Sequence, residues 1–472
     1  MRKPPTDEEI LHLKIRARKI ERNRKKRKSR NADSRRIFLK EYRTNKKYRD
    51  LAKYIKTYED ALNVFLPKNL KYLLLCSDGP FHDIKIEPKL KTLVKTIQIP
   101  QRFSIIENET ESIKCIRQII HSLINQECQE LWIDYKSCKY IDLLTQIYLD
   151  AILKDWDTFV RYCIRASISQ FIKVKAVGGR NYNNRTIQQM INSVGSPTIL
   201  INRETQYSDI VPFKLRYFDA EKEQLHNKGI HNEIDSTLLI EYVEKCLSRL
   251  GLGLTNTAKS DLGTVIGETV INASEHSSLK SRYLIGYFEE RQCKQGCKGI
   301  LHIVILNFGQ TIYQKFKNPD ESVPINITCL NQMKKLSSQY DRRQLFKKQE
   351  FTEETLWTLY SLQQGVTIIP DKNRGNGTVQ FIDKFFKLKG NNDVDSVSRL
   401  YILSGQSIIE FDGSYNLTKV RDGFGTRDIM TFNSSGSLEN KPDSNYVRQM
   451  RTFFPGTAIF ARIQINTNNI IN

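Results

Sequence analysis

Membrane-spanning and secretory segments are missing from this sequence of 472 residues. It contains no run of about 18 apolar residues, the length that a helix needs to cross a bilayer. The first residues, MRKPPTDEEILHLK, lack the apolar core of a secretory signal. We therefore expect a cytoplasmic protein that makes no contact with a membrane.

Cysteine is scarce and shows no pairing pattern. The nine cysteines are odd in number and scattered through apolar segments, which is typical of reduced thiols. Cys293 and Cys297 lie close together, on either side of a predicted hairpin turn. No second cysteine pair or histidine cluster accompanies them to complete a zinc site. The sequence therefore predicts neither disulfides nor structural zinc.

Negative charge is also in short supply. The 74 Lys and Arg outnumber the 52 Asp and Glu, and 20 of these basic residues, against 7 acidic ones, lie in the first 50 positions. No Phe, Tyr or Trp occurs between Leu11 and Arg36, which removes base stacking. We predict a basic helical or disordered arm over residues 1–50. A solvated tail, an acidic protein partner, or nucleic-acid phosphates bound through residues 14–49 would each account for its charge.

Strand and helix patterns alternate between residues 51 and 200. An amphipathic helix at 50–66 begins this part of the chain. The predicted strands lie at 96–100, 130–135 and 171–177, and the predicted helices at 109–126, 141–162 and 183–194. This alternation predicts an α/β module, in which helices pack on an open sheet.

One stretch of this module, LWIDYKSCKYIDLLTQIYL, resembles the centre of STAS domains, the fold of anti-anti-sigma factors. In that family a strand ends in an aspartate, as at Asp134, and a second aspartate, as at Asp142, precedes a phosphorylated serine. Leu143 occupies the serine position here. The resemblance implies a docking module without chemistry of its own, and Leu143 argues against a phosphorylation switch.

The segment from Asp261 to Ser278, DLGTVIGETVINASEHSS, predicts a buried helix with a polar stripe. Glu268 and Asn272 are four residues apart, so their side chains share one face of this helix. A strand at 214–219 and a helix from Asp235 to Leu250 are predicted before it.

Three later segments follow this helix: KGILHIVILNFGQTI at 298–312, NRGNGTVQF at 373–381 and FPGTAIFARIQI at 454–465. We expect a strand, a glycine loop that leads into a helix, and a second strand. In this order the four segments resemble the N box, G1 box, G2 box and closing Gly-Thr strand of the GHKL superfamily. This superfamily includes gyrase-type and MutL-type ATPases, Hsp90, histidine kinases and anti-sigma serine kinases. The resemblance implies an ATP-binding α/β sandwich of Bergerat type over residues 210–467, with Mg²⁺ as cofactor.

The resemblance also implies roles for individual residues. Asn272 would coordinate Mg²⁺, and Glu268 would orient or deprotonate the attacking water or hydroxyl. Asn307 stands where most members have an aspartate that accepts the adenine amino group, and Thr311 replaces the second glycine of the G1 box. The remaining nucleotide contacts would come from Gly309, Arg374, Gly375, Gly377, Thr378 and Thr457.

These features favour an ATP- and Mg²⁺-binding protein that acts with a protein partner, by slow hydrolysis or by a nucleotide-gated conformational change. Three alternatives stay open: a serine kinase of the anti-sigma type, a nucleic-acid-associated ATPase, and a scaffold with a degenerate nucleotide site. A homodimer is a further alternative, because many GHKL proteins dimerise.

Overall fold

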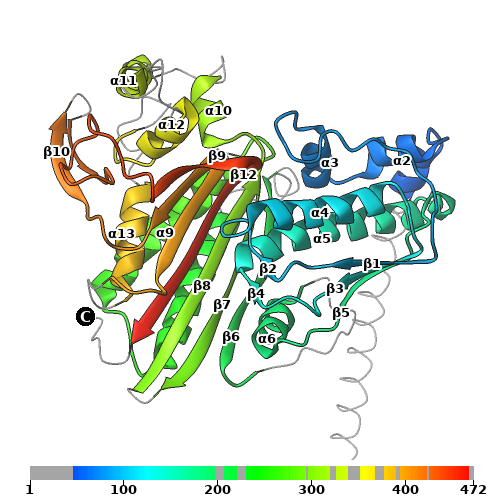
Figure 1. The fold of residues 1–472 in the computed structure, drawn as a ribbon, viewed down its shortest axis with the longest axis horizontal. Coiled ribbons are helices and arrows are strands. Elements are labelled where there is room, and N and C mark those ends of the chain that lie inside the picture. Colours follow the sequence, from blue (N-terminus) through cyan, green and yellow to red (C-terminus); the bar gives the residue numbers. More distant parts are fainter. Residues whose placement is uncertain are drawn as a thin grey trace, which may run out of the picture. The chain divides into compact units, whose positions relative to one another are not determined.

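The computed structural model describes residues 46–196, 207–220, 230–275, 277–293, 296–318, 326–338, 351–366, 377–389, 394–422 and 425–466. These residues form a mixed α/β structure (Figure 1). By packing, the chain divides into two units: Met1–Leu66 with Asp157–Ile172, and Pro67–Trp156 with Lys173–Asn472. Most of the predicted arm lies outside the described residues, and the three predicted domains remain predictions. No helix in the described part has the length and apolar character needed to span a bilayer.

The first unit contains short helices. Residues 46–52 are helical, and α2 spans Tyr58–Phe65. The prediction of one helix over 50–66 is wrong, because Thr57 begins a new one: its hydroxyl accepts from the Asp60 amide, and the Asp60 carboxylate accepts from the Thr57 amide. Tyr48 stacks on Tyr162, with ring centroids 4.8 Å apart.

The second unit begins with α3 (Lys68–Leu75) and a parallel sheet in the order β1-β3-β5. The strands are β1 (Val94–Gln98), β3 (Glu130–Asp134) and β5 (Ala176–Arg180). The helices are α4 (Glu109–Ile124), α6 (Arg185–Val194) and α5 (Leu143–Arg165), whose residues from Asp157 onward belong to the first unit. This alternation confirms the predicted order. The third strand starts later than predicted, at Ala176 instead of Phe171, because Ser169–Phe171 forms a 3₁₀ turn before β5. The two-residue strands β2 (Arg102–Phe103) and β4 (Tyr140–Ile141) are too short to leave a sequence pattern.

A five-stranded antiparallel sheet follows, in the order β6-β7-β8-β12-β9. Its strands are β6 (Ile210–Asp219), β7 (Ser281–Cys293), β8 (Gly296–Phe308), β9 (Arg399–Phe411) and β12 (Val447–Asn466). The strands predicted at 214–219, 298–312 and 454–465 are present. The predicted hairpin between Cys293 and Cys297 joins β7 to β8, where Cys293 pairs with Gly296.

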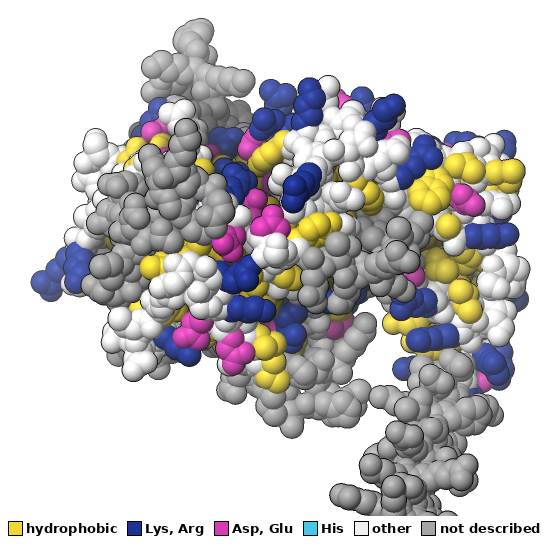
Figure 2. All heavy atoms as spheres, turned by 90° about the horizontal axis from the view of Figure 1, so that it is seen from below, with side chains coloured by type: hydrophobic (Ala, Val, Ile, Leu, Met, Phe, Trp, Pro, Cys, Tyr) yellow, Lys and Arg dark blue, Asp and Glu magenta, His cyan; other side chains and the backbone are white. Residues whose placement is uncertain are grey.

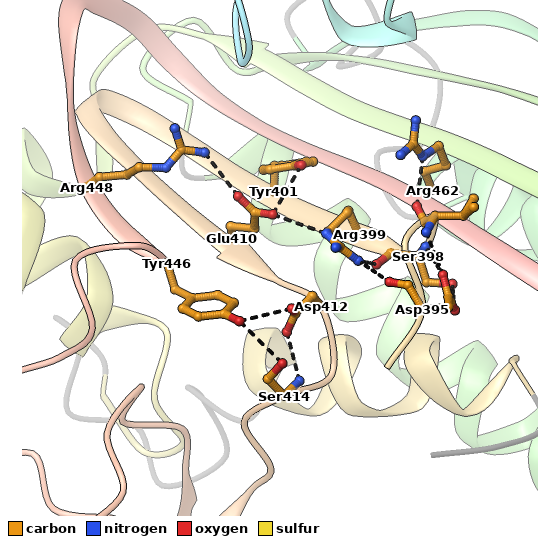
Figure 3. A network of polar contacts seen from close by, with 11 residues as sticks. Asp395, Ser398, Arg399, Tyr401, Glu410, Asp412, Ser414, Tyr446, Arg448 and Arg462 are labelled. Atoms are coloured by element: carbon orange, nitrogen blue, oxygen red, sulfur yellow. Dashed lines mark hydrogen bonds and ion pairs between the residues drawn. The ribbon is translucent and has the colours of Figure 1, made fainter. Parts of the chain in front are cut away.

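Strand β9 folds back on itself. An extended strand rises about 3.3 Å per residue, so the ends of a straight β9 would lie about 40 Å apart. Instead, Arg399 Nε lies 3.2 Å from Glu410 Oε1, and the Tyr401 hydroxyl lies 3.4 Å from the same oxygen (Figure 3). Gly405 has φ 58°, a value that favours glycine, and it lies at the reversal. Both arms of β9 pair with β12.

Helices α8 (Ile230–Ser248), α9 (Asn256–Glu275) and α13 (Gly377–Lys387) cover one face of this sheet. They form one apolar core with alternate residues of β8, such as Ile303 and Ile305. The helix predicted over 235–250 starts earlier than expected, so Asp235 lies inside α8. Its carboxylate accepts from Arg216 Nε at 2.5 Å and from the buried Arg282 at 2.6 Å. This ion pair network joins α8 to β6 and β7.

Smaller elements gather near the turn of β9. They are α10 (Ile312–Lys317), α11 (Ile327–Ser338), α12 (Glu353–Ser361), β10 (Thr418–Asp422) and β11 (Gly425–Ile429). Helix α12 packs against β9. Glu354 accepts a hydrogen bond from the Gln406 amide at 3.0 Å, just past Gly405. This bond holds α12 against the turn of β9.

The other face of the five-stranded sheet contacts the part of the chain that carries the parallel sheet. The Tyr148 ring of α5 lies 5.4 Å from the rings of Phe308 and Phe454. At the start of α4, the Glu109 carboxylate accepts a hydrogen bond from the Arg451 amide at 3.1 Å. Within the second unit, the antiparallel sheet therefore has α8, α9 and α13 on one face and residues of α4 and α5 on the other.

Candidate functional site

The polar stripe of α9 lies beside its apolar side. Val265, Ile266 and Val270 are buried in the core, whereas Glu268 and Asn272 are partly exposed. Neither of these two side chains hydrogen-bonds to another residue of the described structure. Burial raises the pKa of the Glu268 carboxyl above its usual value. A carboxylate with a raised pKa and an unengaged carboxamide therefore lie one helical turn apart.

Asn307 joins three of the four predicted segments. It lies near the end of β8 and is 4% exposed. Its Nδ2 donates to the carbonyl oxygen of Ala273 in α9 at 2.7 Å, and its Oδ1 accepts from the Thr457 amide in β12 at 3.1 Å. A single side chain thereby connects the end of α9, the end of β8 and the Gly-Thr strand.

These contacts give a physical reason for asparagine at position 307. An ionised aspartate has no hydrogen to donate, so its second oxygen would face the Ala273 carbonyl with like partial charge. The amide oxygen of Asn307 has two lone pairs, and the Thr457 amide uses one of them. The other can still accept a hydrogen bond from a ligand.

Two glycines at this site allow segments of the chain to approach closely. Gly456 has φ 146°, and a Cβ there would lie 2.1 Å from the Asn307 carbonyl oxygen. Gly309 has φ 128°, and a Cβ there would lie 2.6 Å from Ser278 Oγ. The Ser277 hydroxyl donates to the Phe308 carbonyl at 2.5 Å. The ends of β8 and α9 and the middle of β12 are thus packed against one another.

Ser404 is a residue of this site that the sequence analysis missed. Its hydroxyl lies 3.0 Å from Thr457 Oγ1, donates to the Gly456 carbonyl at 3.1 Å and accepts from the Ile312 amide at 2.9 Å. Ser404 pairs with Thr457 in the sheet. Only this strand register identifies Ser404 as a residue of the site, because the sequence around Ser404 contains no motif that would do so.

Thr311 is fully buried and caps α10. Its hydroxyl accepts from the Gln314 amide at 3.1 Å, and Gln314 Oε1 accepts from the Thr311 amide at 3.0 Å. The residue that replaces the second glycine of the G1 box therefore has a structural task in starting the next helix.

The glycine-loop segment is described only from its helix onward. Arg374 and Gly375 lie outside the described residues. Gly377 is the first residue of α13, and Thr378 follows it, partly exposed. Lys384 of α13 forms an ion pair with Asp261 of α9, so the two helices are held together. The structure thus unites three of the four segments and fixes the helix that follows the remaining one.

The residues of the site suit a magnesium ion that arrives with phosphates. Within the described ranges, no cluster of three or more His, Cys, Asp or Glu residues could hold a metal. Mg²⁺ in nucleotide sites keeps several waters and takes one or two protein ligands beside the phosphate oxygens. The unengaged amide oxygen of Asn272 fits that role, whereas a cage made by protein alone does not fit these residues.

The aspartates of the STAS-like stretch have structural partners. Asp134 accepts from the Lys136 amide at 2.9 Å and from Asn181 Nδ2 at 3.0 Å. Asp142 accepts from the Thr145 amide at 2.6 Å at the start of α5, and burial raises the pKa of its carboxyl. Leu143 is 1% exposed. Position 143 therefore belongs to the core and presents no group to modify.

Comparisons of the chain with models of protein families, with curated proteins and with solved structures found no match. A functional assignment therefore depends on the residues at the ends of α9 and β8 and around Thr457 of β12.

Proposed function

We propose that this chain is a cytoplasmic ATP- and Mg²⁺-binding protein of GHKL type, with a STAS-like module before its nucleotide domain. It would act with a protein partner, by slow ATP hydrolysis or by a nucleotide-gated conformational change. The observation that carries this proposal is the position of Asn307, whose carboxamide bonds to both α9 and β12. A sheet with α8, α9 and α13 on one face also agrees with the sandwich that the resemblance implies.

In this proposal each polar group has a separate task. The amide oxygen of Asn272 would hold Mg²⁺, which when bound neutralises phosphate charge. Glu268 would accept a proton from the attacking water, and its raised pKa brings it closer to the range in which a general base works at neutral pH. The free lone pair of Asn307 Oδ1 would accept the adenine amino group, beside Thr457.

One feature favours the scaffold alternative. Both polar ends of the Asn307 side chain are already bonded to the protein, so a nucleotide gains one hydrogen bond there and no charge. If that is too weak, the same residues would serve to hold α9, β8 and β12 together without binding ATP.

Titration calorimetry of the full chain with ATP and Mg²⁺ separates these outcomes. We expect binding by the unchanged protein and at least about tenfold weaker binding by Asn272→Ala, equivalent to about 1.4 kcal/mol. Absence of binding heat in the unchanged protein, at several temperatures, would contradict the proposal and support the scaffold.

Turnover tests the role of Glu268 separately. Glu268→Gln should retain nucleotide binding and lose about 10²-fold or more of the hydrolysis rate, because amides do not accept the proton. Glu241→Gln, an exposed position on the neighbouring α8, is the matched control and should leave both unchanged. Equal hydrolysis rates for Glu268→Gln and the control would show that the Glu268 carboxylate takes no part in the reaction.

A further inference from the structure

A small cavity within the second unit lies between α13, the segment that follows β9, and the residues that follow β11. Its volume is about 50 Å³, enough for a small group, since one water needs about 10–15 Å³. The residues that line it are Ile382, Asp383, Phe386, Phe411, Asp412, Gly413, Tyr415, Asn416, Leu417, Met430 and Phe432. No residue of the proposed nucleotide site contributes to this lining.

Aromatic rings form much of the wall. The Phe432 ring centroid lies 5.1 Å from that of Phe411 and 5.4 Å from that of Tyr415. Phe386 lines the cavity from α13. Phe432 has φ 54°, which is uncommon for a bulky residue, and its neighbours must hold it there. Such a wall offers ring faces, which attract cations through their negative quadrupole.

The same wall contains a buried carboxylate, that of Asp412, whose hydrogen-bond donors in the described structure are neutral. Asp412 is 7% exposed, and its oxygens accept from the Ser414 amide at 2.8 Å and from the Tyr446 hydroxyl at 3.0 Å (Figure 3). Both donors are neutral. Across the described ranges, no Lys, Arg or His nitrogen lies within 4 Å of this carboxylate. A buried ionised carboxylate is costly unless a cation accompanies it.

The rest of the wall does not supply that cation. Asp383 adds a second carboxylate, which is bound to Lys387 at 2.7 Å, one turn along α13. The whole sequence carries a net charge of +22, and Lys and Arg side chains are spread over the face drawn in Figure 2. The overall field therefore repels cations, and any attraction for one must come from the local carboxylate and rings.

We propose that this pocket binds a lysine side chain of a partner protein. The ammonium group would lie at the Asp412 carboxylate, and the four-carbon stem would lie along the rings of Phe386, Phe411 and Phe432. A lysine suits the small cavity better than an arginine, because the guanidinium group is a wide plane and the ammonium is compact. This proposal does not depend on nucleotide binding.

The test uses the full chain and small probes, observed by saturation-transfer NMR. The probes are N-acetyl-lysine N-methylamide, its norleucine counterpart and putrescine. We expect saturation transfer to the side-chain protons of the lysine probe. The norleucine probe should bind at least about tenfold more weakly than the lysine probe, because it loses about 1.4 kcal/mol of charge interaction. Equal binding of norleucine, or no transfer to lysine, would overturn the proposal. Tighter binding of putrescine than of the lysine probe would overturn the proposal and indicate a free polyamine as the ligand.

A substitution at Asp412 gives an independent readout. Asp412→Asn keeps the shape and leaves an oxygen for the Ser414 amide, so we expect lysine binding to be lost. Asp428→Asn, on β11 outside the lining, is the matched control and should leave lysine binding unchanged. Unchanged lysine binding by Asp412→Asn would contradict the proposal.

Discussion

The two faces of the five-stranded sheet use the same strands for different purposes. Toward α8, α9 and α13, alternate residues such as Leu301, Ile303 and Ile305 of β8 enter a continuous apolar core. Toward the α/β module, the intervening residues form an aromatic row across four strands, with Tyr287 of β7 stacked on His302 of β8 at 4.1 Å. The row continues through Phe460 of β12 to Tyr401 of β9.

The second face also buries titratable groups. His302 is 6% exposed, and neither ring nitrogen makes a hydrogen bond within the described structure, although Nε2 lies 3.5 Å from Glu289 Oε1. Burial raises the pKa of Tyr401 to about 12, with Glu410 adding to the effect. The apolar face thus provides the core of the domain, whereas the polar face meets another part of the chain.

The candidate site lies at the edge of the apolar face. Because side chains alternate along a strand, Asn307 follows Ile305 on the helix-facing side, and Thr457 precedes Ile459 on the paired strand. The side chain of Asn307 at this edge contacts the end of α9 directly, through the Ala273 carbonyl. The comparison of the two faces therefore also explains why a ligand site would form here.

The largest expected effect follows from removing a ring on the helix-facing side. Phe288 is fully buried, and its ring lies over Gly299, where a Cβ would come within 2.1 Å of it. Phe288→Ala should cost about 3–5 kcal/mol of unfolding free energy, because it leaves a void in a close-packed core. Urea unfolding measures this loss.

Tyr401→Phe is the matched control on the opposite face. It removes a hydroxyl that lies 3.4 Å from Glu410, and we expect a change below about 1 kcal/mol. Similar losses in the two variants would show that the faces do not differ as described.

A smaller effect is expected at the edge of the apolar face. Asn307→Asp replaces a donor to the Ala273 carbonyl by a carboxylate oxygen, which should cost about 1–3 kcal/mol at pH 7. The cost should shrink as the pH is lowered toward about 4, because a protonated carboxyl can donate again.

Unfolding of Asn307→Asp at several pH values tests this signature. Asn331→Asp, at an exposed position of α11, is the control and should stay within about 0.5 kcal/mol of the unchanged protein. A penalty for Asn307→Asp that is equal at all pH values would mean that the bond to Ala273 does not matter.

The smallest predicted effect concerns protonation on the polar face. Burial lowers the pKa of His302, Glu289 partly offsets this, and Arg462 and Arg291 add to the lowering. Because the folded pKa lies below the unfolded value of about 6.5, the unfolded state takes up the proton first as the pH falls. Stability should therefore decline between about pH 7 and 5, with a slope from this group of at most about 1.4 kcal/mol per pH unit.

His302→Phe keeps the stacked ring next to Tyr287 and removes the proton site. The pH slope of its unfolding free energy should be smaller than that of the unchanged protein. His82→Gln, at an exposed position, should leave the slope as it was. A slope for His302→Phe equal to that of the unchanged protein would assign the pH dependence to other groups.

Much of the helix and strand order could be predicted, because long apolar periods are local. The positions of α9, β8 and β12 follow from such periods, as does the shared face of Glu268 and Asn272. The turn of β9 at Gly405 was not predicted, although the polar stretch SGQS at 404–407 separates two apolar runs as a turn does. Ser404 was missed for another reason, because its role comes from pairing with Thr457.

The sequence by itself determined which side chains share one helix face and which strands alternate, because those relations depend on backbone geometry within a few residues. Tertiary structure alone decided that Asn307 is held between Ala273 and Thr457, which are 34 and 150 positions away. It also decided that Asp412 is buried among aromatic rings. Hydrogen bonds and burial of this kind depend on how distant segments pack, and no local pattern encodes that packing.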